Sequence, residues 1–96
     1  MPLTIVVGLG RSGLGAARLV HPQGEKVVAL ERGTGLDQTS SAATLQAEGI
    51  QVELGIPLEV NSFEPWRSDL TAVVVGPGIP WDHPTLDSLR QEGVQI

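Results

Sequence analysis

Three glycines near the amino terminus have the spacing of a phosphate-binding turn. They lie between a β-branched run and a segment of helical periodicity, in the G-x-G-x-x-G motif Gly8-Leu9-Gly10-Arg11-Ser12-Gly13. In that position the glycines permit a tight turn, let the backbone approach a diphosphate and allow close helix packing. N–H groups at the helix start would hold the anion, with Arg11 and Ser12 adding donors. The alternative is a simple strand-to-helix turn.

An acidic residue follows the glycine motif at the spacing of a ribose- or base-binding carboxylate. Glu31 ends the second apolar run, 18 residues after Gly13, close to the spacing of about 20 at which a carboxylate meets a ligand's ribose or base. The neighbouring side chain is Arg32. The alternative for Glu31 is a solvated carboxylate at a strand end.

A third candidate segment closes the fourth apolar run. It reads Gly76-Pro77-Gly78-Ile79-Pro80. Its place after a strand would set it opposite the glycine motif, across the point where the strand order of a doubly wound sheet reverses and ligands bind. Taken alone, this segment is equally compatible with an ordinary Pro-Gly turn that binds no ligand.

The remaining polar residues do not suggest catalysis. His21 and His83 have no cysteine or nearby histidine at metal-ligand spacing, so both are interpreted as surface or capping residues. Asp82 beside His83 resembles an acid–base pair, but no serine or cysteine nucleophile is placed to use it. We therefore assign no catalytic residue and no metal site.

The elements that would position these residues alternate along the chain. Strands are predicted at residues 3–7, 26–30, 50–54, 72–75 and 94–96. Helices are predicted at 12–20, from the hydroxyl residues 39–41 to Gly49, and from residues 82–84 to Gly93. Between residues 55 and 70, we expect Phe63 and Trp66 to pack a short helix or turn against the sheet.

This alternation predicts an α/β fold. We expect one Rossmann-like domain over residues 1–96, with a doubly wound, five-stranded parallel sheet in the order 3-2-1-4-5. Because the last strand stops at the end of the sequence, we expect the chain to be a fragment of a longer protein.

Composition narrows the classes of partner. Hydrophobic residues make up 41% of the 96 residues and charged residues 18%, a composition that favours a folded domain. The net charge is −5, so no broad basic face is expected that could bind nucleic acid or an anionic membrane. The chain has no cysteine, and its first apolar run is too short to span a bilayer. A cytoplasmic location fits these features.

Taken together, these segments strongly resemble the start of the UDP-N-acetylmuramoyl-L-alanine:D-glutamate ligases. The resemblance runs from end to end and rests on residues 6–15, on Glu31, and on residues 76–80 with His83-Pro84. It implies that this domain holds the UDP part of UDP-N-acetylmuramoyl-L-alanine, while a central domain binds ATP and magnesium and a third completes the active cleft. In that family ATP activates the substrate carboxylate as an acyl phosphate, which the amine of D-glutamate attacks.

The resemblance also implies roles for individual positions. The backbone around Gly10, Arg11 and Ser12 would hold the diphosphate. Glu31 and Arg32 would lie beside the uracil, and the turn Gly76-Pro77-Gly78 would line the opposite wall. The family usually has serine in place of Gly76 and aspartate in place of Glu31, so a hydroxyl contact is missing at the first of these positions. The L-alanine-adding relatives usually have different sequences in the glycine loop and this turn.

Within these 96 residues we expect no cofactor and no ligase activity. The ATP-binding pattern G-x-x-x-x-G-K-[ST] is absent, because the single lysine, Lys26, begins a strand. Two other classes remain open. One is an NAD-binding domain of a dehydrogenase or ligand-sensing module, for which Glu31 would favour NAD over NADP, although the turn at 76–78 is then unexplained. The other is a docking domain without a ligand.

Overall fold

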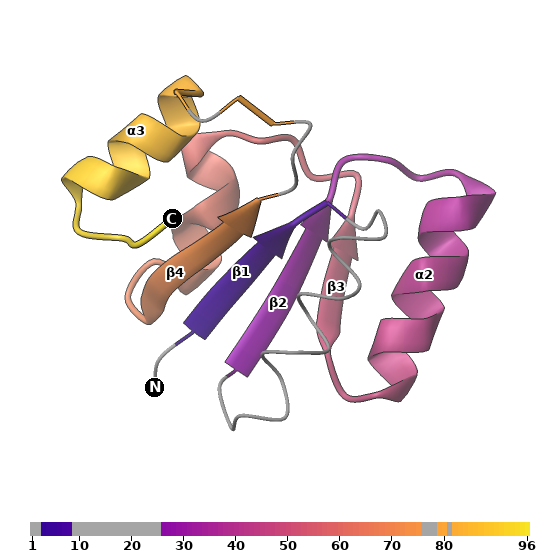
Figure 1. The fold of residues 1–96 in the computed structure, drawn as a ribbon. Coiled ribbons are helices and arrows are strands. Elements are labelled where there is room, and N and C mark those ends of the chain that lie inside the picture. Colours follow the sequence, from indigo (N-terminus) through magenta and orange to yellow (C-terminus); the bar gives the residue numbers. More distant parts are fainter. Residues whose placement is uncertain (1–2, 9–25, 76–78, 81) are drawn as a thin grey trace.

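The computed structural model describes residues 3–8, 26–75, 79–80 and 82–96 of the chain (Figure 1). The predicted helix at 12–20 and the turn at 76–78 lie outside these residues. Among the residues that are described, no helix is long and apolar enough to cross a membrane.

Within the described residues, four parallel strands form the sheet. They are β1 (Leu3–Val7), β2 (Lys26–Glu31), β3 (Gln51–Leu54) and β4 (Leu70–Val75). Their spatial order is β3-β2-β1-β4, which confirms the predicted order of the first four strands. The inner strands β1 and β2 are rich in valine, isoleucine and leucine, as expected for strands covered on both faces.

The expected fifth strand is not seen, so the prediction of five strands was wrong. The segment after the last helix makes a single parallel bridge, in which Ala72 pairs with Gln95. Gln95 makes both bonds of this bridge, since its N–H donates to the Thr71 carbonyl at 3.0 Å and its carbonyl accepts from the Val73 N–H at 2.8 Å. The preceding residue, Val94, still belongs to the helix end, because its N–H donates to the Leu89 carbonyl at 3.0 Å. The segment nevertheless lies beside β4, where the fifth strand was expected.

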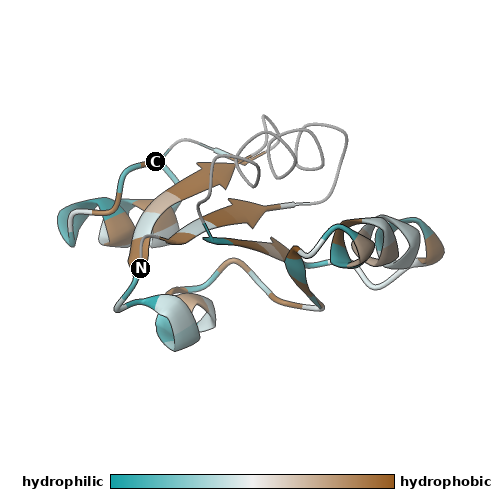
Figure 2. Ribbon diagram, turned by 90° about the horizontal axis from the view of Figure 1, so that it is seen from below, coloured by the Kyte–Doolittle hydropathy of each residue, from teal (hydrophilic) through white to brown (hydrophobic). Residues whose placement is uncertain are grey.

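The described helices contribute to buried clusters on opposite faces of the sheet, and one of them lies beside the edge strand β3 (Figures 1 and 2). Helix α2 (Leu36–Ala47) packs on one face, and the 3-10 helix η2 (Val60–Trp66) and helix α3 (Pro84–Gln91) pack on the other. The strands are predominantly hydrophobic in Figure 2, whereas the helices also carry hydrophilic segments. The parallel sheet with helices packed against it confirms the predicted α/β fold.

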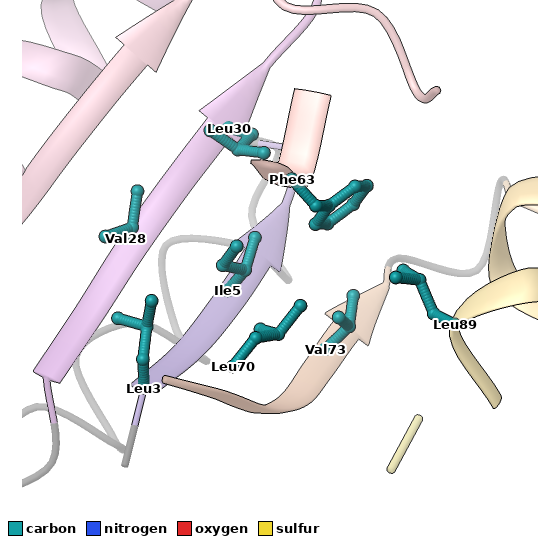
Figure 3. Close-up of a cluster of buried hydrophobic side chains, with 8 residues drawn as sticks. All are labelled: Leu3, Ile5, Val28, Leu30, Phe63, Leu70, Val73 and Leu89. Carbon is teal, nitrogen blue, oxygen red and sulfur yellow. The ribbon is translucent and has the colours of Figure 1, made fainter. Parts of the chain in front are cut away.

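The larger buried cluster lies between the sheet and the η2–α3 layer. Figure 3 shows its members: Leu3, Ile5, Val28, Leu30, Phe63, Leu70, Val73 and Leu89. Phe63 is fully buried, and the half-buried Trp66 packs against the same cluster, which confirms the expectation for both aromatic residues. Burying one such large apolar side chain contributes about 1.5–3 kcal/mol, so η2 is held mainly by Phe63.

Helix α2 begins earlier than predicted. Its N-cap is Gly35, without a side-chain capping bond, so the expectation that a hydroxyl at 39–41 caps it was wrong. Thr39 instead donates its hydroxyl to the Gly35 carbonyl at 2.9 Å, four residues back within the helix. A threonine hydroxyl inside a helix can donate to the carbonyl four residues earlier, so its presence does not mark the helix start.

Candidate ligand site at the carboxyl ends of the strands

The candidate site is built at the edge of the sheet where the parallel strands end. Val7 of β1 pairs with Leu30 of β2 on one side and with Val75 of β4 on the other. The carboxyl ends of β2, β1 and β4 therefore lie side by side. Of the predicted site residues, Gly8, Glu31 and Arg32 are described and lie at this edge. The other seven, at positions 10–13 and 76–78, lie outside the described residues.

Gly8 is the residue at which the chain leaves β1. Its N–H donates to the Leu30 carbonyl at 2.8 Å, which extends the ladder by one step. Its φ of +93° lies in the left-handed region, which side chains other than hydrogen rarely tolerate. None of the described residues lies within 4 Å of the position a Cβ would take, and the backbone conformation by itself favours glycine here.

Glu31 closes β2 and organises the loop after the strand. Its carbonyl accepts from the N–H of Ile56 at 3.0 Å, which joins the ends of β2 and β3. Its carboxylate oxygen Oε2 accepts from the N–H of Gly33 at 2.6 Å, and the residue is half-buried. The side chain is thus turned toward this loop, whereas Arg32, between Glu31 and Gly33, is exposed.

The loop at residues 32–35 also rests on its neighbours. A Cβ at Gly33 would lie 3.0 Å from Cδ of Gln38, and one at Gly35 would lie 2.9 Å from Oε1 of the same side chain. The methyl group of Thr34 lies 3.3 Å from the corresponding position of Gly55, in the loop after β3. Gln38 was missed by the sequence analysis. The two closely spaced glycines were the only signal that a side chain approaches the backbone here.

The start of α3 is attached to the same edge of the fold. The hydroxyl of Thr85 donates to the carbonyl of Leu58, after β3, at 3.0 Å. The N–H of Thr85 donates to Nδ1 of His83 at 3.1 Å, and His83 is the N-cap of α3. The capping interpretation of His83 is therefore confirmed.

The described part of the site offers groups for binding rather than for catalysis. It contains a carboxylate, an exposed guanidinium and a glycine-containing backbone, which provide charge and hydrogen bonds. Within the described ranges no three acidic, histidine or cysteine residues gather where they could hold a metal ion. The assignment of no catalytic residue stays a prediction.

Comparison with known proteins gives a consistent picture. Residues 3–96 match the family model described as Mur ligase MurD-like, N-terminal domain. The chain is 88% identical over its 96 residues to the UDP-N-acetylmuramoylalanine--D-glutamate ligase of Synechococcus sp. (strain CC9902). It is 62% identical to the same enzyme of Synechococcus sp. (strain CC9605) and 57% identical to that of Prochlorococcus marinus (strain MIT 9313), in both cases over 96 residues. The chain spans about a fifth of the length of these relatives, 21% of each.

Proposed function

The chain belongs to the Mur ligase MurD-like N-terminal domain family, and from this membership we propose what it binds. The ligand is the uridine diphosphate part of UDP-N-acetylmuramoyl-L-alanine. Binding serves the ATP-dependent addition of D-glutamate to that substrate, in the cytoplasmic synthesis of peptidoglycan precursors. The proposed reaction belongs to a longer protein of which these residues are the substrate-binding domain.

One observation carries the proposal beyond family membership. The register of β1 and β2 sets the left-handed Gly8 next to the end of the strand that carries Glu31. The first residue opens the glycine motif and the second carries the carboxylate, so the phosphate-binding turn and the base-recognising side chain would meet at one edge. This is the edge at which doubly wound sheets bind nucleotides.

The proposed division of labour follows the order of the motifs. Backbone N–H groups at Gly10, Arg11 and Ser12 receive the diphosphate. The uracil lies against Glu31 and Arg32. The turn at 76–78 forms the opposite wall. The assignments at 10–12 and 76–78 rest on the sequence, whereas the proposal for Glu31 also draws on the bond that turns its carboxylate toward the loop.

We place ATP and magnesium outside these 96 residues. The sequence has no phosphate-loop lysine, and the described residues contain no cluster of acidic or histidine side chains suited to a metal. The central and carboxyl-terminal domains of the longer relatives are the proposed location of the ATP site and of the acyl-transfer chemistry. The partner of this domain is therefore the remainder of such a chain.

A set of paired titrations tests the proposal. The 96-residue chain is titrated with UDP, UDP-N-acetylmuramoyl-L-alanine, ADP and NAD at equal ionic strength, while amide NMR signals are followed. UDP should bind about tenfold to a hundredfold more tightly than ADP. Adenine would lose the polar contacts that the site makes to the edge of uracil, and this loss costs roughly 1–3 kcal/mol of binding free energy. Shifts should concentrate at residues 8–13, 31–33 and 76–79. Tighter binding of ADP or NAD there would instead support the dinucleotide alternative.

A further inference from the structure

Two glycines in the loop after β2 are not explained by backbone conformation. The described glycines with positive φ are Gly8, Gly49, Gly55 and Gly93. Gly33 and Gly35 are not among them, and Gly35 has φ −71° and ψ 178°, which any residue can adopt. A different physical reason is needed for the missing side chains at these two positions.

The Cβ positions of both glycines lie against one side chain, that of Gln38. Gln38 lies in the first turn of α2 and is half-buried. Its Cγ, Cδ and Nε2 atoms lie 3.1, 3.0 and 3.2 Å from the Cβ position of Gly33, and its Oε1 lies 2.9 Å from that of Gly35. Real Cβ contacts below about 3.4 Å are rare. A side chain at either position would therefore shift the flexible amide end of Gln38 out of its contact with the loop.

The loop is held from a second direction as well. The N–H of Gly33 is bonded to the Glu31 carboxylate at 2.6 Å. Gly33 therefore lies between Glu31, which accepts from its N–H, and Gln38, whose side chain lies next to its Cβ position. Arg32 lies between Glu31 and Gly33 in the chain, and it is exposed.

We propose that Gln38 is a positioning residue of the nucleotide site, which packs against Gly33 and Gly35 to hold the loop at 32–35 in its ligand-binding shape. The inference rests on the proposed function and adds a residue to it. A loop that is ordered before binding loses less conformational entropy when the ligand arrives. Gln38 thus acts on affinity through Glu31 and Arg32.

The position of Gln38 allows this role to be separated from folding. Helix α2 is anchored to the sheet by the buried residues Ala42 and Leu45. Gln38 is polar and only half-buried, and it lies in the first turn of α2, one turn before Ala42. Shortening its side chain should therefore leave the core intact while releasing the loop.

The test compares three variants of the 96-residue chain by UDP titration. Gln38→Ala removes the packing atoms and should weaken UDP binding about tenfold. Gln38→Met keeps a side chain of similar length and should restore affinity to within about threefold of the original. Gln46→Ala is the matched control, because Gln46 lies in the same helix but approaches the Val52 carbonyl near its other end. It should leave affinity unchanged.

A second probe disturbs the same contact from the loop. Gly33→Ala places a methyl group 3.0 Å from Gln38 Cδ, so it should weaken UDP binding in the original chain and have little further effect in Gln38→Ala. Non-additivity of this kind indicates a direct interaction. Fully additive effects would overturn the inference, as would equal losses in Gln38→Ala and Gln46→Ala, or unchanged affinity in Gln38→Ala. If the original chain does not bind UDP at all, the proposed function falls too.

Discussion

Replacing Glu31 by alanine removes a side-chain hydrogen bond to the loop backbone at the candidate site, the 2.6 Å contact of its carboxylate with the Gly33 N–H. Hydrogen bonds to charged groups contribute about 1.5–3 kcal/mol, and partial solvent exposure reduces this to roughly 1 kcal/mol here. For a domain of this size, about 1 kcal/mol corresponds to a fall in Tm of roughly 4–8 °C. The fold should therefore survive the change.

The effect on the ligand should be larger than the effect on the fold. Glu31→Ala loses both the ordered loop and the proposed contact with the uracil, so UDP affinity should fall about tenfold to a hundredfold, equivalent to roughly 1–3 kcal/mol. ADP, which is expected to share only the diphosphate contacts, should lose less. The preference for UDP over ADP should therefore shrink in this variant.

Isothermal titration calorimetry with UDP and ADP measures the two affinities, and thermal unfolding of the same samples measures Tm. Glu53→Ala is the matched control: it removes the same charge from the neighbouring strand, where Glu53 pairs with Leu30 and is exposed. UDP affinity should not change in the control. The reasoning is refuted if Glu31→Ala binds UDP as tightly as the original chain, or if both variants lose affinity equally.

Three further predictions concern the glycine motif, the hydrophobic core and the ligase activity of the 96-residue chain. Gly10→Val should weaken UDP far more than it lowers Tm, because a Cβ would stand where the diphosphate approaches; unchanged affinity in a folded variant would remove the motif from the site. Phe63→Ala should lower the free energy of unfolding by about 3–5 kcal/mol, seen as a lower urea midpoint, and an effect below about 1 kcal/mol would contradict its place in the core. The 96-residue chain should form no acyl phosphate with ATP, magnesium, D-glutamate and the muramoyl substrate, and turnover above the blank would disprove this.

The strands were predictable because their apolar runs satisfy local and global requirements together. In β2, Val27 and Ala29 face the α2 layer while Val28 and Leu30 face the other cluster. A continuous apolar run with helices before and after it has few alternatives to a strand in a parallel sheet. The order of the four strands then follows from right-handed crossovers.

Element ends were less predictable because they depend on partners elsewhere in the chain. The sequence offers hydroxyls at 39–41 as helix caps, yet α2 begins at Leu36, where Gln38 in its first turn packs on the preceding glycines. At the other end, Val94 has a β-branched side chain but its N–H completes the end of α3. In both cases a backbone or side-chain contact outweighed a residue preference.

The candidate site shows the same division between pattern and contact. Gly8 and Glu31 could be placed from the sequence, because a strand end needs only the strand to be recognised. Gln38 could not, since its role depends on where the first turn of α2 meets the loop before it. Neither Gly33 nor Gly35 has a positive φ, and the Cβ position of each lies 2.9–3.0 Å from an atom of Gln38. The spacing of the two glycines alone does not reveal this contact between the loop and α2.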